Sequence, residues 1–170
     1  MSICHQRKLI FVHIPKNAGT SIHSLLNTNP KDLILTDQRW IKYKNHFGKY
    51  WEDYTTFSIV RNPISRFISF YKYWKMNGNL DYDINYFIKN IDEIETPIKN
   101  TQSWFICENN KIMVDVVVRY ENLYEDLKKI QIDSIPHLNI SRIEDESLLN
   151  LSKTSIDTLY QIYKEDFKLL

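Results

Sequence analysis

The sequence is poor in the residues that mark several common protein classes. It has two cysteines, Cys4 and Cys107, three glycines in 170 residues, and a net charge of only +1. Two cysteines cannot build a disulfide framework, and two free thiols in a reducing compartment are the simpler interpretation. A net charge near zero gives no general attraction to nucleic acid or to an anionic membrane, so any anion-binding site has to be local.

Long apolar runs are also missing. No run approaches the ~18 residues of a membrane-spanning helix, and strand-like sequence begins near Lys8 where a signal peptide would lie. These features predict a soluble, cytoplasmic protein without a transmembrane segment. There is no internal repeat and no Pro- or Gly-rich linker, so residues 1–170 are predicted to form a single domain.

Several catalytic motifs are absent as well. No group of Cys and His residues has the spacing of a zinc site, and neither Gly-x-Ser-x-Gly nor Gly-x-Gly-x-x-Gly occurs. A Walker A loop needs Lys directly after its second Gly, whereas here Lys16 precedes Gly19. A kinase or NTPase of the Walker A type is therefore disfavoured.

What is present is an alternation of strand-like and helix-like segments. Continuous apolar or β-branched runs predict buried strands at residues 9–12, 33–35, 56–60 and 114–118. Helical spacing, with Pro63 in a first turn and Gly78 after a last one, predicts helices at residues 20–27, 63–76, 82–90, 121–130 and 156–169. This pattern predicts an α/β protein: a P-loop-like three-layer fold with a mainly parallel central sheet flanked by helices.

The first candidate site follows the first predicted strand. It reads His13-Ile14-Pro15-Lys16-Asn17-Ala18-Gly19-Thr20-Ser21. Small side chains at Asn17, Ala18 and Gly19 suit a turn whose backbone N–H groups surround a phosphate. Lys16 supplies a mobile positive charge, and Thr20 and Ser21 supply hydroxyls where a helix begins. For this turn alone, the simpler alternative is a strand–turn–helix with a solvated lysine.

The second candidate site follows another predicted strand. It reads Val60-Arg61-Asn62-Pro63-Ile64-Ser65-Arg66-Phe67-Ile68-Ser69. The Arg61 guanidinium can bind a phosphate through two hydrogen bonds, and the Ser69 hydroxyl can donate a third. The alternative is that Arg61 pairs with a surface carboxylate and Ser69 faces the core. Ligands of parallel sheets bind beyond the carboxyl ends of the strands, so the two turns together predict one nucleotide with phosphates at two ends.

These two motifs resemble those of sulfotransferases that use 3′-phosphoadenosine-5′-phosphosulfate (PAPS), most closely the carbohydrate branch with its Golgi-type, heparan- and chondroitin-like members. The resemblance implies that Lys16 contacts the oxygen bridging the phosphate and the sulfuryl group. It also implies that residues 16–21 hold the 5′-phosphate, that Arg61 and Ser69 hold the 3′-phosphate, and that Arg66 supports them. No metal is needed, since the cations neutralise the charge. Animal relatives are usually anchored in the Golgi membrane by an apolar segment. Because this sequence has no comparable apolar run, the chain is expected to be cytoplasmic unless it is a trimmed catalytic domain.

Sulfuryl transfer also needs a base for the acceptor hydroxyl. Relatives often carry a histidine between the two motifs, and His46 fits that place; His23 is a second candidate, and an exposed loop histidine is the alternative. Residues 40–51 are basic and aromatic. They could stack on a sugar and pair with an anionic glycan, or they could form a partly buried loop with solvated lysines.

Three later segments extend the resemblance. Gln102 begins a Gln-x-x-aromatic element that lies near the acceptor in relatives, Glu121 begins a Glu-Asn-Leu helix start, and Arg142 lies in a loop that covers the nucleotide. Compensation of the helix dipole is a sufficient role for Glu121. Arg142 is expected to close on the 3′-phosphate.

The sequence therefore predicts an enzyme that transfers a sulfuryl group from PAPS to a hydroxyl of a carbohydrate or glycoconjugate acceptor, leaving 3′-phosphoadenosine-5′-phosphate (PAP). Two alternatives stay open: a small P-loop-like nucleotide kinase, and a non-catalytic module that binds a nucleotide or a glycan. The acceptor and the oligomeric state are not predicted.

Overall fold

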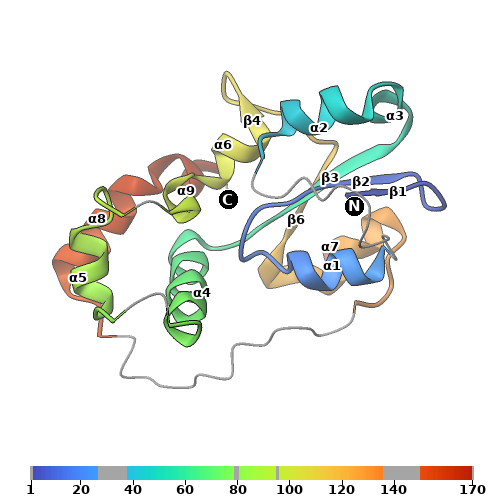
Figure 1. Ribbon diagram of the computed structural model, residues 1–170. Coiled ribbons are helices and arrows are strands. Elements are labelled where there is room, and N and C mark those ends of the chain that lie inside the picture. Colours follow the sequence, from blue (N-terminus) through green and yellow to red (C-terminus); the bar gives the residue numbers. More distant parts are fainter. Residues whose placement is uncertain (1, 27–37, 79–80, 95, 136–149, 170) are drawn as a thin grey trace. The chain divides into compact units, whose positions relative to one another are not determined.

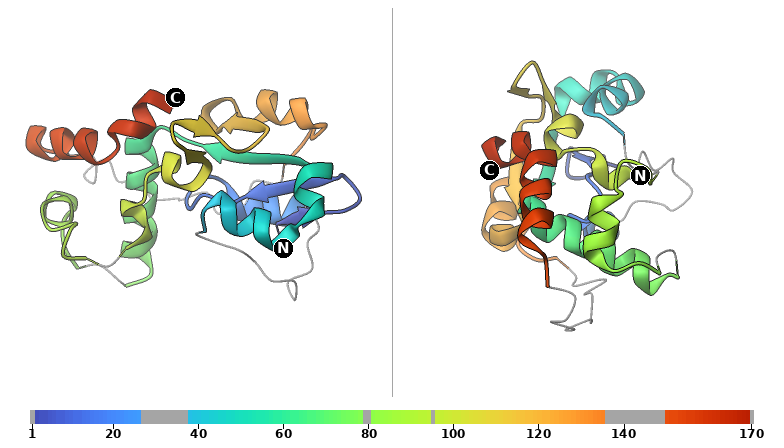
Figure 2. Two further views of the ribbon diagram at one scale, coloured as in Figure 1. Left: turned by 90° about the horizontal axis from the view of Figure 1, so that it is seen from above. Right: turned by 90° about the vertical axis from the view of Figure 1, so that its left-hand side faces the viewer.

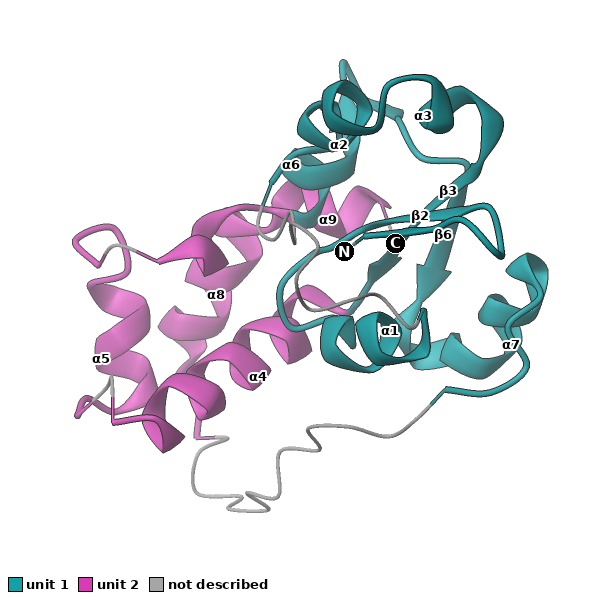
Figure 3. Cartoon of the chain, turned by 45° about the vertical axis from the view of Figure 1, so that its right-hand side comes forward, with its two compact units in different colours: residues 1–61, 102–139 teal, residues 62–101, 140–170 magenta. Residues whose placement is uncertain are grey.

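A computed structural model of the chain describes residues 2–26, 38–78, 81–94, 96–135 and 150–169. They form two compact units, each built from two segments of the chain (Figure 3). Unit 1 comprises residues 1–61 and 102–139, and unit 2 comprises residues 62–101 and 140–170. Each unit has its own cluster of buried apolar side chains. That residues 1–170 act as a single domain stays a prediction.

Unit 1 is built on a four-stranded, mainly parallel sheet (Figure 1), which confirms the predicted fold class. The strand order is β1-β2-β3-β6; β2 is parallel to β3, β3 is parallel to β6, and β1 is an antiparallel edge strand. The bounds are β1 (Ile3–Cys4), β2 (Leu9–Val12), β3 (Thr55–Val60) and β6 (Val116–Arg119). A separate hairpin pairs β4 (Cys107–Glu108) with β5 (Lys111–Ile112).

Helices cover both faces of this sheet, as the predicted three layers require. In Figures 1 and 3, α1 and α7 lie on one face and α2 and α3 on the other, and Figure 2 gives two further views of the same elements. The helical bounds are α1 (Gly19–Leu25), α2 (Trp40–Phe47), α3 (Lys49–Asp53), α6 (Gln102–Ile106), η2 (Tyr120–Asn122), α7 (Leu123–Leu127) and η3 (Lys128–Ile130).

Burial on both faces explains why the strands of unit 1 are readable as continuous apolar runs. All four residues of β2 are buried, and so are the last five of β3. β6 begins at Val116, two residues later than predicted, because Asp115 is held by side-chain bonds. Its Oδ2 accepts from Thr56 N (2.8 Å) and Thr56 Oγ1 (2.7 Å). Asp115 N also donates to Thr56 O (3.0 Å), so both the backbone and the side chains of these two residues are bonded at this end of the sheet.

The basic, aromatic stretch forms two helices separated by Gly48, whose φ of 52° suits glycine. Trp40, Tyr43 and Trp51 are buried, so these three rings are not available to stack on a sugar, in line with the alternative of a partly buried stretch, whereas Tyr50 is half-buried. Lys44 forms an ion pair with Glu52 (2.8 Å). The helical spacing of the apolar residues could not be recognised in the sequence because both helices are short.

Unit 2 is helical throughout its described part. Its elements are α4 (Pro63–Met76), α5 (Ile84–Lys89), η1 (Pro97–Lys99), α8 (Lys153–Ile162) and α9 (Lys164–Leu169). α4 has the predicted bounds, with Asn62 Oδ1 accepting from Ser65 N at its start and Gly78 at φ 69° beyond its end. The predicted helix 156–169 is instead two helices that meet at Tyr163, whose buried hydroxyl donates to Ile98 O (2.8 Å). The predicted strand 33–35 lies outside the described residues.

Candidate active site

The first turn joins β2 to α1 and has an unusual backbone. Lys16 and Ala18 both have left-handed φ values, 70° and 58°, although neither is glycine. Alternation of left-handed and ordinary backbone turns successive N–H groups toward one side, which makes a concavity suited to an anion. The helix that follows carries Thr20 exposed and Ser21 buried. The predicted hydroxyls therefore differ in their access to a ligand.

Gly19 is required for a steric reason. A Cβ at this position would overlap the Nε2 and Cδ2 atoms of His13. The His13 ring therefore packs directly on the Gly19 backbone, and it also lies near the rings of Phe11 and His23. The glycine keeps the turn against the strand that precedes it.

The second turn begins where β3 ends, and it holds Arg61. The Arg61 guanidinium lies over the Tyr120 ring, 4.3 Å from its centroid, and Nη1 donates to Lys16 O (3.4 Å). Among the described residues Arg61 forms no ion pair, and its buried Nε has no hydrogen-bond partner. The expected alternative, a salt bridge to a surface carboxylate, is therefore wrong within the described part of the chain.

Two buried amide side chains connect the turns. Asn17 Nδ2 donates to Ile59 O and to Gln102 Oε1, both at 2.7 Å. Gln102 Oε1 also accepts from Arg61 N (2.8 Å), and Gln102 Nε2 donates to Arg61 O (2.7 Å). Asn17 and Gln102 are both fully buried. The resemblance associated Gln102 with the acceptor, but the structure places its amide between the two turns; no local sequence signal indicated this contact.

The site concentrates positive charge in a partly desolvated place. Burial, together with the nearby charge of Arg61, lowers the pKa of Lys16 from 10.5 to about 8. Burial also lowers the pKa of Arg61, whereas Tyr120 and Glu121 act to raise it. Glu121 thus has an electrostatic effect on the site beyond the predicted dipole compensation. An anion placed between the two cations would relieve their repulsion.

Comparison with known proteins agrees with this geometry. Residues 1–170 match the Sulfotransferase family. The chain belongs to this family. An uncharacterized protein of Archaeoglobus fulgidus is 32% identical over 89 residues, which cover 51% of this chain and 73% of the archaeal protein. No solved structure matches the chain.

The remaining predicted residues of this family member lie on other elements. His46 is exposed in the last turn of α2, a helix anchored near the end of β2 by Tyr43, whose hydroxyl accepts from His13 N (3.1 Å). Ser69 is half-buried on α4 in unit 2, so it does not face the core. Arg142 lies outside the described residues.

Arg66 has a structural environment in unit 2. It is fully buried, and its Nη1 donates to Asn100 O (3.0 Å). Its charge acts on the buried Tyr163, as does that of the buried Asp166. These contacts lie among helices α4, α8 and α9, so Arg66 stabilises unit 2.

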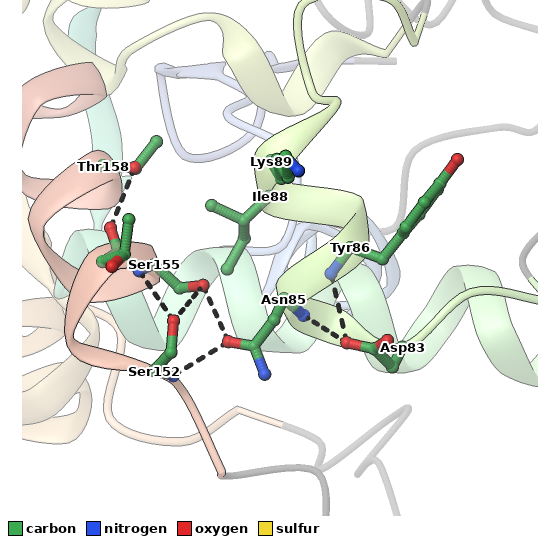
Figure 4. A pocket seen from close by; sticks show the side chains of 9 residues that line it. Asp83, Asn85, Tyr86, Ile88, Lys89, Ser152, Ser155 and Thr158 are labelled. Atoms are coloured by element: carbon green, nitrogen blue, oxygen red, sulfur yellow. Dashed lines mark hydrogen bonds between the residues drawn. The ribbon is translucent and has the colours of Figure 1, made fainter.

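A cavity of about 450 Å³ lies between α5 and α8 of unit 2 (Figure 4). Its polar groups are largely used by the protein itself. Asn85 Oδ1 accepts from Ser152 N (2.8 Å) and Ser155 Oγ (2.7 Å), and Asp83 caps α5. These bonds hold the two helices together, so the cavity offers few unsatisfied groups to a ligand.

Two features were not found in the described residues. No group of three or more His, Cys, Asp or Glu side chains is arranged to hold a metal ion. In the same part of the chain, no helix has the length and apolar character needed to cross a membrane.

The contact between Gly19 and His13 gives a stability prediction. We expect Gly19→Ala to lower the free energy of unfolding by about 1–3 kcal/mol, because the added methyl group overlaps the His13 ring. The loss should be smaller in a His13→Ala background, where the methyl group has room. Urea denaturation measures both effects, with exposed Ser24→Ala on the same helix as the control. An equal loss in both backgrounds would show that the ring contact is not the cause.

Proposed function

We propose that the protein transfers a sulfuryl group from PAPS to a hydroxyl of a carbohydrate or glycoconjugate acceptor. The proposal is carried by the two cations at one edge of the sheet. Arg61 lies against the Lys16 backbone, and its charge contributes to the lowered pKa of Lys16. A polyanionic ligand such as PAPS is the kind of molecule that such a site stabilises.

The turns suit different parts of PAPS. The concave backbone of residues 16–19, with the Thr20 and Ser21 hydroxyls, would hold the 5′-phosphate, and Lys16 would contact the oxygen that bridges phosphorus and sulfur. Arg61 would bind the 3′-phosphate, and the sequence resemblance assigns Ser69 and Arg142 to the same phosphate. The buried, unpartnered Nε of Arg61 supports this role, since the group is a donor still able to bind an acceptor oxygen.

The reaction needs positioning, charge neutralisation and one proton transfer. The acceptor oxygen attacks sulfur in line, the bond between sulfur and the bridging oxygen breaks, and PAP leaves with the electron pair of that bond. The Lys16 ammonium would stabilise the negative charge that develops on the bridging oxygen. His46 would take the proton of the acceptor hydroxyl. Its exposure leaves it accessible to an acceptor in solution.

Binding of PAP and ADP tests the nucleotide assignment, because ADP lacks the 3′-phosphate. We expect calorimetry to show that PAP binds more tightly. Arg61→Ala should weaken PAP binding by about 2–3 kcal/mol, the loss of a charged hydrogen-bonded partner, and should leave ADP binding nearly unchanged. Arg7→Ala, at an exposed arginine in the β1–β2 turn, is the matched control. Equal binding of PAP and ADP by the unmodified protein would reject the PAPS assignment and favour the nucleotide kinase.

The lowered pKa of Lys16 predicts a pH dependence of ligand binding. Below pH 8 the ammonium is charged; its charge is lost as the pH rises through about 8, well before an ordinary lysine at 10.5. We therefore expect PAP affinity to fall between pH 7.5 and 9.5. Lys16→Arg should remove this fall, because arginine keeps its charge throughout that range. A flat profile for the unmodified protein would contradict the assignment of Lys16.

The proposed base is tested by separating binding from turnover. We expect His46→Ala to leave PAP affinity unchanged and to lower kcat by about 10²–10⁴. His5→Ala, at a histidine packed against Tyr50 and Tyr54, is the control and should retain normal kcat. Normal turnover of His46→Ala would show that another residue is the base, and His23 would then be substituted.

A further inference from the structure

We propose that Gln102, through its buried bonds to Asn17 and Arg61, is a positioning residue that sets the spacing of the two phosphate-binding turns. This inference rests on the proposed function, because it assigns both turns to one ligand. It gives Gln102 a part in nucleotide recognition without contact to the nucleotide.

The pairing of β2 with β3 ends before the two turns begin. The last paired residues of β2 and β3 are Val12 and Ser58. Lys16 and Arg61 both lie beyond that pair, so no ladder bond between β2 and β3 fixes their separation. Beyond this pair, side-chain amides connect the two chain segments, since Asn17 Nδ2 donates to Ile59 O. Gln102 then bonds to both backbone groups of Arg61.

The hydrogen bonds of the Gln102 amide determine its orientation. Oε1 accepts two hydrogen bonds, from Asn17 Nδ2 (2.7 Å) and Arg61 N (2.8 Å), while Nε2 donates to Arg61 O (2.7 Å). A flipped amide would set its NH₂ group against two donors and its oxygen against a carbonyl. Only one orientation satisfies the network. Because the side chain is fully buried, losing these partners would leave desolvated backbone groups unpaired.

The hydrogen-bond network around Gln102 is expected to affect ligand binding. A ligand with phosphates at two ends gains its full affinity only if both turns are already at the matching separation. If Gln102 fixes that separation, its loss weakens the binding of PAP, which has phosphates at two ends and engages both turns. It weakens the binding of ADP less, because ADP has phosphates at one end only and engages one turn. A purely structural role would instead weaken all ligands by a similar factor. The ratio of PAP to ADP affinity therefore distinguishes the two roles.

The experiment compares Gln102→Met, which keeps the length of the side chain and removes the amide, with Thr56→Val. Thr56→Val removes buried hydrogen bonds to Asp115 at the opposite end of β3, so it matches the loss of polar contacts away from the turns. Calorimetry with PAP and ADP measures affinity, and thermal melting verifies folding. We expect Gln102→Met to reduce PAP affinity at least tenfold and ADP affinity threefold or less. Thr56→Val should leave the ratio unchanged.

Equal losses for PAP and ADP, or no loss for either, would overturn the positioning role. If Gln102→Met does not fold, Gln102→Asn replaces it; this variant keeps the amide but is one methylene too short to reach both turns, and the same change in ratio is expected. A double variant with Asn17→Ser should lose less PAP affinity than the sum of the two single losses, since the two side chains share one hydrogen bond. Additive losses would count against the shared network.

A separate ligand distinguishes failure of this inference from failure of the proposed function. If the unmodified protein shows no preference for PAP over ADP, the PAPS assignment fails. Inorganic sulfate then probes the anion site between Lys16 and Arg61 directly. At least a fivefold loss of sulfate affinity in Gln102→Met, with none in Thr56→Val, would support the spacing role; unchanged sulfate affinity would reject it.

Discussion

The parallel pairing of β2 with β3 is the constraint on which the site depends. Parallel strands end at the same edge, so the turns that follow them are neighbours although Lys16 and Arg61 are 45 residues apart in the sequence. An antiparallel arrangement would carry one of these cations to the opposite edge. Burial of β2 and β3 under helices on both faces holds this arrangement in place.

That arrangement has an energetic cost, and the cost explains several otherwise separate features. Two cations side by side in a partly buried site repel one another, and burial together with this repulsion lowers the pKa of Lys16. The protein offsets part of this repulsion with the Tyr120 ring against the guanidinium and with the negative charge of Glu121. None of these groups neutralises the site fully. A site of this kind is prepared for an anion before the anion arrives, so little reorganisation is needed on binding.

The sequence predicted the elements whose signals are local. β2, β3 and α4 were readable because continuous burial and a capped, Pro-initiated helix leave a pattern in consecutive residues. The helices α2 and α3 were not, since each is too short to show a helical period. The break between α8 and α9 falls at Tyr163, whose hydroxyl bonds to Ile98 O across 65 residues, a contact that a local pattern does not reveal.

The candidate site shows the same division. Lys16 and Arg61 were identified from the turns that hold them, and the left-handed backbone at Ala18 agrees with the expected tight turn. The contacts of Gln102 and Tyr120 with Arg61 could not be predicted, because they arise only when α6 and η2 fold onto the ends of the strands. Gly19 was singled out for its small size, but the reason is the His13 ring.

The second motif contains two arginines that lie close together in the sequence. Arg61 and Arg66 are five residues apart, yet their environments differ in kind. Arg61 is partly buried at the end of a strand, with its guanidinium over the Tyr120 ring, whereas Arg66 is fully buried among helices and donates to a backbone carbonyl. A buried cation that already interacts with its own unit is poorly available to a ligand, because a new anion would have to displace protein contacts and be desolvated as well. Arg66 therefore stabilises the helical unit to which it belongs, and Arg61, which lies beside Lys16, is the arginine of the motif that we propose for anion binding.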